Sequence, residues 1–454
     1  MLAATFWVIV NKMKFIVGVV AILMIGAAIF LFSESRSVNV EATISPNFNE
    51  VAATSSFGLP LLPEHQIPTS TVASSSANTR AADIPNQLPL PNPPSAIKGI
   101  YVTGWSAGYA PKINSLINLA ERTELNAMVI DIKDYSGHVS YKMDATEIAE
   151  SGAVSEIRIA QPNVLIKKLH DANIYVIGRI TVFQDPILAK AHPEWALRNK
   201  LTGKTWVDNK GLAWMDPAAE PVWEYNIAVV KDALARGFDE INFDYVRFAS
   251  DGDLSNISYP FWDGKTPKHA VIENFFRFLR ENAPGAKLSV DLFGLSTVNH
   301  DDMGIGQVIE DAYKYFDYVC PMVYPSHYAP GFIGYQNPAQ YPYEVISYSL
   351  EHALARLLNS ATSDKQQATS SLASSSENSA TQLSSTTAPL FMAKLRPWLQ
   401  DFDLGANYDA AMVKKEMQAT YDVLLNGSSS GQFAGWFLWD PSNIYTEGAL
   451  ETRN

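Results

Sequence analysis

The sequence has one cysteine in 454 residues, so no disulfide can form within the chain. This cysteine, Cys320, lies in the apolar run 317–324, a setting typical of buried packing rather than of a reactive thiol. Positive charge is also scarce, because 34 lysines and arginines face 47 aspartates and glutamates, a formal net charge of −13. This balance argues against nucleic acid or an anionic membrane surface as the main partner.

Two catalytic motifs are missing too. The sequence contains no His-Glu-x-x-His and no phosphate-binding Gly-x-x-x-x-Gly-Lys-Ser/Thr. These absences argue against zinc proteolysis and nucleotide hydrolysis. The eight histidines are scattered, with no spacing diagnostic of a metal site, so we expect neither a metal nor a cofactor.

One long apolar run is present, at residues 15–32, and it carries no charge. As a helix it would be roughly 27 Å long, close to the thickness of the hydrocarbon core of a membrane. Lys12 and Lys14 precede it, which predicts a cytoplasmic amino end and an exported remainder. No Ala-x-Ala motif follows, so we expect residues 1–32 to be a retained transmembrane anchor. The alternative is a cleaved signal peptide, which would give a secreted protein.

Two further stretches lack the periodicity of packed structure. Residues 33–95 are rich in Ser, Ala, Thr, Pro and Asn, and such a composition buries too little apolar surface to offset the entropy of ordering. We therefore expect a disordered linker with a root-mean-square span of roughly 40–45 Å. Residues 361–388 form a Ser/Thr/Ala/Gln tract, which we expect to be a low-complexity insertion in a surface loop without a catalytic role.

Residues 97–446 alternate short apolar runs with helical periodicity, the pattern of a parallel β/α array. Strands are predicted at residues 99–105, 127–133, 174–183, 240–248, 287–295, 318–324, 395–402 and 433–439. Helices are predicted at residues 113–124, 162–172, 217–236, 268–282, 305–315, 343–359 and 409–426. Eight strands over a domain of about 350 residues favour an α/β fold of the closed (β/α)8 TIM-barrel class.

The stretch 239–248 carries the most informative residues. Asp244 lies near the carboxyl end of the predicted strand, and Arg247 follows three residues later. A buried carboxylate is unfavourable unless it is paired or hydrogen-bonded, so an Asp at the end of a barrel strand indicates a functional site. Arg247 is its expected charge partner. A purely structural Asp–Arg pair that closes the strand end is the alternative.

In a barrel of this kind the active face is built where strands end and helices begin. Besides Asp244 and Arg247, the candidate residues at those positions are Tyr101, Trp105, Asp131, Lys133, Asp134, Arg179, Asp291, Tyr324, Trp398, Gln400, Trp436, Trp439 and Asp440. The acidic candidates also fit helix caps or loop acceptors, and the aromatic ones also fit core and rim packing. Asp244 and Asp291 fit a cap less well, because each lies within an apolar run.

Two carboxyl groups on neighbouring strands are the arrangement that hydrolysis of a glycosidic bond requires. One protonates the leaving oxygen, while the other attacks the anomeric carbon or directs water at it. We expect Asp244 to be the nucleophile or base, with a pKa lowered by Arg247, and Asp291 to be the general acid. Lys133 and Arg179 would hold polar substrate groups, and the tyrosines and tryptophans would stack on sugar faces.

Six segments carry a resemblance to a known family, in the order KGIYVTGWSAG, NAMVIDIKDYSG, DEINFDYVRF, SVDLFGL, VCPMVYPSHY and FAGWFLWDPSNIY. They resemble the bacterial glycoside-hydrolase family DUF4015, which is similar to the glycosidase barrels of the α-amylase-like superfamily. The resemblance implies a barrel that hydrolyses carbohydrate, and in related glycosidases the Asp of strand four, here Asp244, is commonly the principal catalytic carboxylate. The α-amylase pattern has an Arg two residues before this Asp and a Glu ending strand five, where this chain has Asn242 and Asp291.

The sequence thus predicts a glycoside hydrolase that acts on a cell-surface or cell-wall polysaccharide. We expect it to be held at the cell membrane by a single pass, with the barrel outside the cytoplasm and no obvious protein partner. Two other functions remain open. One is a carbohydrate-binding barrel without turnover, and the other is a scaffold in envelope assembly.

Overall fold

The structure, a computed structural model, describes residues 82–374, 393–426 and 430–453. The predicted anchor at residues 1–32 and the first part of the predicted linker lie outside these residues. Within the described ranges, no helix combines the length and the apolar character needed to span a membrane.

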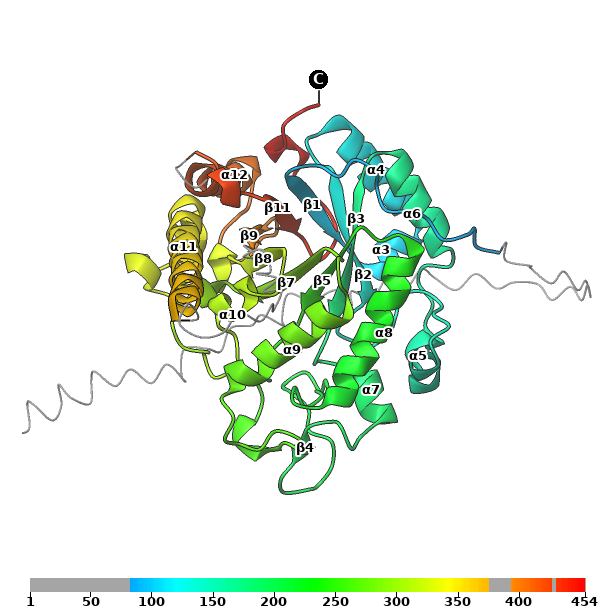
Figure 1. The fold of residues 1–454 in the computed structure, drawn as a ribbon. Helices are drawn as coiled ribbons and strands as arrows, with labels where there is room; N and C mark the ends of the chain where they lie inside the picture. The colour runs from blue at the N-terminus through cyan, green and yellow to red at the C-terminus, as the bar shows by residue number, and fades with distance from the viewer. Residues whose placement is uncertain (1–81, 375–392, 427–429, 454) are drawn as a thin grey trace, which may run out of the picture. The chain divides into compact units, whose positions relative to one another are not determined.

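The centre of the fold is a ring of parallel strands (Figure 1). These strands are β1 (Ile97–Val102), β2 (Ala127–Lys133), β3 (Tyr175–Thr181), β5 (Glu240–Asp244), β7 (Leu288–Phe293), β8 (Tyr318–Met322), β9 (Lys394–Leu395), β10 (Trp398–Gln400) and β11 (Gly435–Trp439). They are hydrogen-bonded in the order β10-β11-β1-β2-β3-β5-β7-β8-β9, and a further parallel pairing of β8 with β10 closes the ring. With β9 and β10 counted as one interrupted strand, this is the eight-stranded parallel barrel that the alternation predicted.

The interruption between β9 and β10 has a local cause. Pro397 follows Arg396 at this point, and proline has no backbone N–H to donate to a strand ladder. The carbonyl of Pro397 still accepts a hydrogen bond from the backbone N–H of Phe437 at 2.9 Å. The seventh strand therefore keeps its direction and its place in the ring across the break.

Helices cover the outer face of the ring (Figure 1). They are α3 (Gly104–Gly108), α4 (Ala110–Arg122), α5 (Thr146–Ser151), α6 (Pro162–Asp171), α7 (Pro186–Ala191), α8 (Glu220–Arg236), α9 (Lys268–Asn282), α10 (Ile309–Tyr313), α11 (Pro342–Ser374) and α12 (Ala410–Leu424). The segment between α7 and α8 and the segment between β5 and α9 are long, and an antiparallel pair, β4 (Arg198–Asn199) with β6 (Ile257–Ser258), ties them together. They therefore enlarge the carboxyl end of the barrel.

Two segments differ from the sequence prediction. Residues 82–96, most of them assigned to the linker, lie against the amino-terminal end of the barrel, where the backbone N–H of Gln87 donates to the last carbonyl of α8 at 3.0 Å. Gly237 ends that helix at φ +103°, and a Cβ there would lie 2.6 Å from the Gln87 carbonyl oxygen. In the predicted insertion, residues 361–374 continue α11, and residues 375–388 lie outside the described ranges.

Successive side chains of each strand point alternately into the barrel and toward the helices, so the apolar side chains form two layers. The inner layer fills the barrel and consists of Ile97, Tyr101, Ala127, Val129, Tyr175, Ile177, Cys320, Tyr324, Trp398, Phe402 and Phe437. The larger outer layer packs the strands against the helices. Polar side chains on the inner positions therefore have to find partners inside the barrel or at its ends.

Candidate active site

Four charged side chains meet at the carboxyl ends of β2, β3, β5 and β7. They are Asp131, Arg179, Asp244 and Asp291, and we call them the mouth cluster. Arg179 lies at the centre, where its Nη1 donates to Asp131 Oδ1 at 2.5 Å and its Nη2 donates to Asp244 Oδ2. Its Nε faces Asp291 Oδ2 at 3.8 Å. One cation thus contacts carboxylates from three different strands.

The strand register explains why these residues meet. Asn242 is paired with Arg179 in the β3–β5 ladder and with Ser289 in the β5–β7 ladder. Side chains two positions further along a strand point to the same face, so Asp244 and Asp291 both point into the barrel one step nearer to its carboxyl end. The structure therefore brings together the two aspartates that the sequence placed on neighbouring strands.

Asp291 is 1% exposed. Its Oδ1 accepts hydrogen bonds from the indole N–H of Trp398 at 2.7 Å and from the amide of Asn242 at 2.8 Å. Burial raises the pKa of the Asp291 carboxyl well above its usual range, and the charge of Asp244 raises it further, while Arg179 opposes both effects. A carboxyl group with a raised pKa is the kind of group that acts as a general acid.

Asp244, 8% exposed, has a different environment. One of its oxygens accepts from Arg179, and the other accepts from the backbone N–H of Tyr245 at 2.6 Å. Tyr245 adopts a φ of +54°, which turns the chain sharply just after the strand. Both carboxylate oxygens of Asp244 thus accept hydrogen bonds, which fixes the orientation of the carboxylate.

Asp131 holds the opposite side of Arg179. Its second oxygen accepts from the phenol of Tyr101 at 2.5 Å, so both oxygens are occupied by donors. Burial raises the pKa of the Asp131 carboxyl, and Arg179 opposes that shift. Asp131 therefore fixes Arg179 in position from the side that faces away from Asp244.

Aromatic side chains line the carboxyl end of the barrel beside the mouth cluster. The ring of Trp439 lies 6.2 Å from that of Tyr101, 5.6 Å from that of Tyr324 and 5.1 Å from that of Phe402, measured between centroids. Burial raises the pKa of the Tyr324 phenol well above its usual range, and the charges of Asp291 and Asp244 add to this shift. Three predicted aromatic residues are thus brought together beside the carboxylates, with Phe402 as a fourth that the sequence did not single out.

Lys133 was predicted to contact substrate, but it points to the outside of the barrel. The register of β2 and β3 shifts between Asp131 and Lys133, and this irregularity turns Lys133 away from the interior. Its ammonium is fully buried and ion-paired with Asp185 at 2.8 Å, and it donates to the carbonyl of Thr181 at 2.6 Å. Lys133 therefore anchors the outer helical layer.

Arg247 was predicted to pair with Asp244, and Arg179 takes that role instead. The guanidinium of Arg247 donates to the carbonyl of Phe248 at 3.1 Å and lies over the rings of Trp214 and Phe293, at 4.7 and 4.8 Å from their centroids. Burial lowers its pKa. The turn at residue 245 separates the Arg247 side chain from the strand end.

Three other candidates are held by neighbours within the protein. Trp436 is fully buried on the outer side of β11, where its indole N–H donates to the hydroxyl of Tyr421 at 3.0 Å. Gln400 accepts from Ser326 and donates to the carbonyl of Phe402. Asp440 accepts from two backbone N–H groups of the loop that follows it, the capping role that the sequence left open.

Two candidates lie on the rim beside the mouth cluster rather than inside it. Asp134 is ion-paired with Arg158, and the guanidinium of Arg158 lies 5.3 Å from the ring centroid of Trp105. Trp105 is 57% exposed, whereas the other aromatic candidates are buried or partly buried. It therefore presents a large ring to solvent close to the carboxyl end of the barrel.

A second buried charged group lies at the opposite end of the barrel. Arg396 and Glu240, which we call the floor pair, are both fully buried and are joined at 2.8 Å. Glu240 also accepts from Ser289 at 2.6 Å, and the guanidinium of Arg396 lies 3.8 Å from the ring centroid of Tyr318. The sequence prediction missed this pair. Its signal was a Glu four residues before Asp244 on the same strand face.

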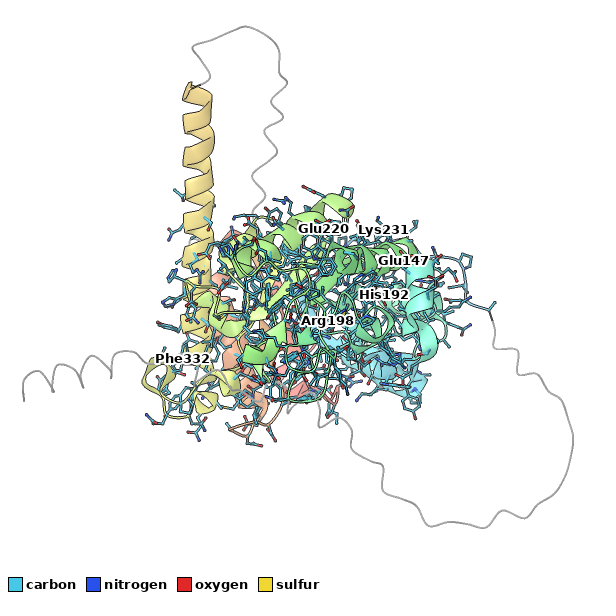
Figure 2. All side chains as sticks on the ribbon, turned by 90° about the horizontal axis from the view of Figure 1, so that it is seen from below. Glu147, His192, Arg198, Glu220, Lys231 and Phe332 are labelled. Atoms are coloured by element: carbon cyan, nitrogen blue, oxygen red, sulfur yellow. The ribbon has the colours of Figure 1, made fainter. Side chains whose placement is uncertain are left out.

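The outer helical layer contains a hollow of about 540 Å³ between α5, α7 and α8. Figure 2 labels Glu147, His192, Glu220 and Lys231, which line it. The ring of His192 is stacked on that of Trp195, 3.8 Å away. The glutamates are exposed on helices outside the ring of strands, so this hollow is separate from the mouth cluster.

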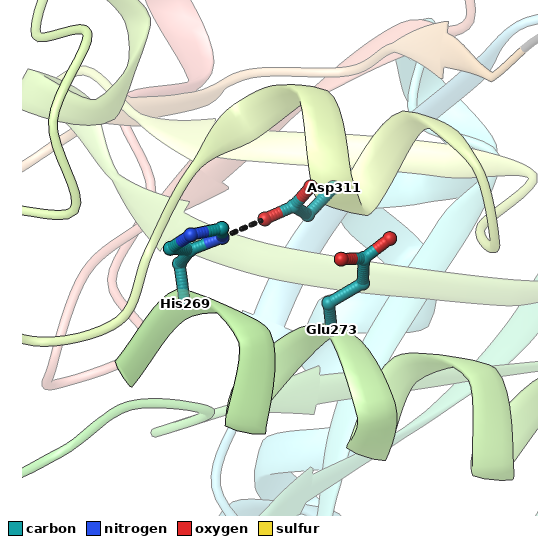
Figure 3. Close-up of side chains that lie close together, drawn as sticks. All are labelled: His269, Glu273 and Asp311. Atoms are coloured by element: carbon teal, nitrogen blue, oxygen red, sulfur yellow. Dashed lines mark hydrogen bonds and ion pairs between the residues drawn. The ribbon is translucent and has the colours of Figure 1, made fainter. Parts of the chain in front are cut away.

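One group in the described part of the chain has the donor atoms of a metal site. Figure 3 shows His269 and Glu273 of α9 facing Asp311 of α10. The ammonium of Lys314 bonds to Glu273 at 2.8 Å and to Asp311 at 3.0 Å, and His269 bonds to Asp311 at 3.0 Å. Lys314 thus already supplies the positive charge between the two carboxylates, and we assign no ion to this group.

Comparisons with known proteins complete the description of the site. A family model described as a putative glycosyl hydrolase domain, DUF4015, matches residues 99–445. A search of the curated proteins finds no match.

Among solved structures, a hypothetical protein from Ruminiclostridium thermocellum is 39% identical over 42% of this chain and 96% of its own, with a TM-score of 0.39. The PgaB (BpsB) glycoside hydrolase domain from Bordetella bronchiseptica is 12% identical over 80% of this chain and 100% of its own, with a TM-score of 0.49. An alpha-galactosidase from Thermus thermophilus, TtGalA, is 14% identical over 80% of this chain and 61% of its own, with a TM-score of 0.43.

Proposed function

The chain belongs to the glycosyl hydrolase domain family DUF4015, and from this premise we propose that it hydrolyses glycosidic bonds of a cell-surface or cell-wall polysaccharide at the mouth cluster. The main observation behind the proposal is that two neighbouring carboxyl groups, those of Asp244 and Asp291, differ in their burial and in their hydrogen-bond partners. Asp244 is held by Arg179 and a backbone N–H, while Asp291 is buried beside them and lies 3.8 Å from Arg179. Two neighbouring carboxyl groups in unequal environments are the usual acid and base of a glycosidase.

In the proposed reaction Asp291 gives its proton to the leaving oxygen as the bond to the anomeric carbon breaks. Asp244 attacks that carbon or directs a water molecule at it, and the developing positive charge on the sugar ring is stabilised by the surrounding carboxylates. Arg179 holds the Asp244 carboxylate in its orientation. Tyr101, Tyr324 and Trp439 provide the aromatic walls against which the sugar lies.

The proposed location of the enzyme rests on the apolar run at residues 15–32, which lies outside the described residues. As a single-pass anchor this run would hold the barrel on the outer side of the membrane, next to a cell-envelope polysaccharide. Carbohydrate binding without turnover and a scaffold role are the other outcomes that the experiments below distinguish.

The test is the release of reducing ends from a panel of cell-wall and capsular polysaccharides. We expect Asp244→Asn to lower kcat by at least about 10³-fold, or about 4 kcal/mol, because the amide neither attacks nor accepts a proton. Asp171→Asn, a change of an exposed carboxylate on α6, is the matched control and should leave the rate unchanged. Binding of polysaccharide by the parent protein with no release of reducing ends would favour the non-catalytic barrel.

A further inference from the structure

We infer that Trp105 is a rigid stacking platform for a second sugar unit, one that lies outside the mouth cluster on the same polysaccharide chain. This inference rests on the proposed function and extends it, because it specifies a polymer rather than a single terminal sugar as the substrate. Trp105 lies in α3, directly after β1, and Tyr109 follows it by four residues. The two side chains are 57% and 62% exposed.

The indole of Trp105 is supported from one side. Arg158 lies 5.3 Å from its ring centroid, and the side chain of Arg158 is 3% exposed. Arg158 is in turn ion-paired with Asp134 and, at 2.8 Å, with Glu156. A buried cation fixed by two carboxylates thus supports the ring, while the remainder of the ring is open to solvent.

The helix that carries Trp105 is also fixed. A Cβ at Gly104 would lie 2.2 Å from Ser140 Oγ, and one at Gly108 would lie 1.8 Å from the Arg158 carbonyl oxygen, so α3 packs on this backbone as closely as glycine allows. Thr103 caps the helix by accepting from the backbone N–H of Ser106 at 3.1 Å. The platform is therefore in place before any ligand binds.

A fixed, exposed indole has a defined chemical use. Exposing so much apolar ring surface is unfavourable in water, and a ring that is already immobile loses little entropy when a ligand covers it. The apolar faces of sugar rings match a flat aromatic surface. A sugar unit is therefore the occupant to which we assign the platform.

The position of the platform links it to the proposed catalytic group. Trp105 follows Tyr101 by four residues on one strand end, and Asp134 follows Asp131 by three residues on the next. The segments that directly follow β1 and β2 thus carry the platform and Asp134, one of the two carboxylates that hold its support. A polysaccharide leaving the mouth cluster on the side of β1 and β2 would pass over Trp105.

The experiment is affinity gel electrophoresis of the full chain carrying Asp244→Asn, with soluble xylan, β-1,3-glucan, galactan, glycol chitin and pullulan as separate probes. We expect at least one polymer to retard the protein. Adding Trp105→Ala should weaken that binding about tenfold, and Trp105→Phe should restore most of it. The disaccharide of the same polymer, measured by calorimetry, should bind all three proteins within about twofold, because it fills only the mouth region.

Tyr348→Ala is the matched control, since Tyr348 is a partly exposed aromatic residue on α11 and should not affect binding. Three results would overturn the inference: no retardation by any polymer, retardation unaffected by Trp105→Ala, or an equal loss of disaccharide binding. Turnover is read separately with the unmodified protein. Binding that depends on Trp105 without any hydrolysis would therefore reject the proposed catalysis and keep the platform.

Discussion

The mouth cluster and the floor pair are two buried charged groups in one barrel, and they differ in how their charges balance. At the floor, one arginine faces one glutamate, and both are fully buried. At the mouth, one arginine faces three carboxylates, and its own side chain is 12% exposed. The floor is thus a closed and neutral pair, whereas the mouth carries surplus negative charge next to solvent.

This difference separates stability from function. A buried pair with matched charges keeps its own environment satisfied and needs no ligand. A surplus of buried carboxylates is unfavourable for folding, and proteins retain such groups mainly where chemistry or binding uses them. In TIM barrels the carboxyl-terminal face carries the active site and the opposite face supports the fold, which agrees with this division.

The largest effect on stability is expected at the floor. Arg396→Met should lower the free energy of unfolding by about 3–5 kcal/mol, because it leaves the Glu240 carboxylate buried without its partner. Urea denaturation of the purified protein measures this change. The double variant Arg396→Met/Glu240→Gln should recover much of the loss, since no unpaired charge remains. Equal losses in the two variants would show that packing of the arginine stem, and not the charge pair, stabilises the floor.

At the mouth the corresponding change should act on rate. Asp131→Asn removes the carboxylate that fixes Arg179 from one side, and we expect kcat to fall about 10- to 100-fold while the free energy of unfolding changes by less than about 1 kcal/mol. A change in the pH profile of kcat would show that Asp131 acts by positioning Arg179. A loss of substrate contact alone would lower kcat without changing its pH profile. Tyr101→Phe, which removes one donor to Asp131, should produce a smaller effect in the same direction. If Asp131→Asn lowered the free energy of unfolding without changing kcat, the role of Asp131 would be structural, like that of the floor pair.

The sequence was sufficient for the barrel and for the meeting of Asp244 with Asp291, because both follow from strand alternation and parallel neighbours. It was insufficient wherever a local backbone irregularity decides the direction of a side chain. A register shift turns Lys133 outward, and a positive φ at Tyr245 separates Arg247 from Asp244. Neither irregularity has a composition or spacing that distinguishes it from a regular strand.

One error could have been avoided from spacing alone. Trp436 and Trp439 are three residues apart on one strand, so they cannot both point to the same face. The structure places Trp436 in the outer layer and Trp439 in the aromatic wall. The central role of Arg179 was harder to predict, because it depends on three carboxylates from separate strands that only the closed barrel brings within reach.

A pH series gives a smaller but more specific contrast between the two ends of the barrel. The pKa of Asp291 is raised in the folded protein, so the folded state binds a proton that the unfolded state has released once the pH exceeds about 4. The stability that this proton provides is complete below that pH and is lost as the pH rises toward the folded pKa. The slope is at most about 1.4 kcal/mol per pH unit.

Asp291→Asn removes this titration. We expect the parent protein to lose stability relative to the variant as the pH rises above about 4. Urea denaturation at each pH measures it. The control is the same series with Asp171→Asn, whose carboxylate is exposed on α6. A parent that gains stability relative to Asp291→Asn as the pH rises would contradict the assignment of Asp291 as the proton carrier.

The smallest effect on stability is expected at Cys320, which lies between the mouth cluster and the floor pair. This residue is paired with Asp291 in the β7–β8 ladder, and burial raises the pKa of its thiol well above the usual range. Cys320→Ala should lower the free energy of unfolding by about 1 kcal/mol, through the small cavity it leaves, and should not change kcat.

The native thiol of Cys320 should also be unreactive toward a disulfide reagent such as DTNB, because reaction requires an exposed thiolate. It should react once urea unfolds the protein. Rapid modification of the folded protein would mean that solvent passes through the mouth into the middle of the barrel, and the separation of mouth from floor would then not hold.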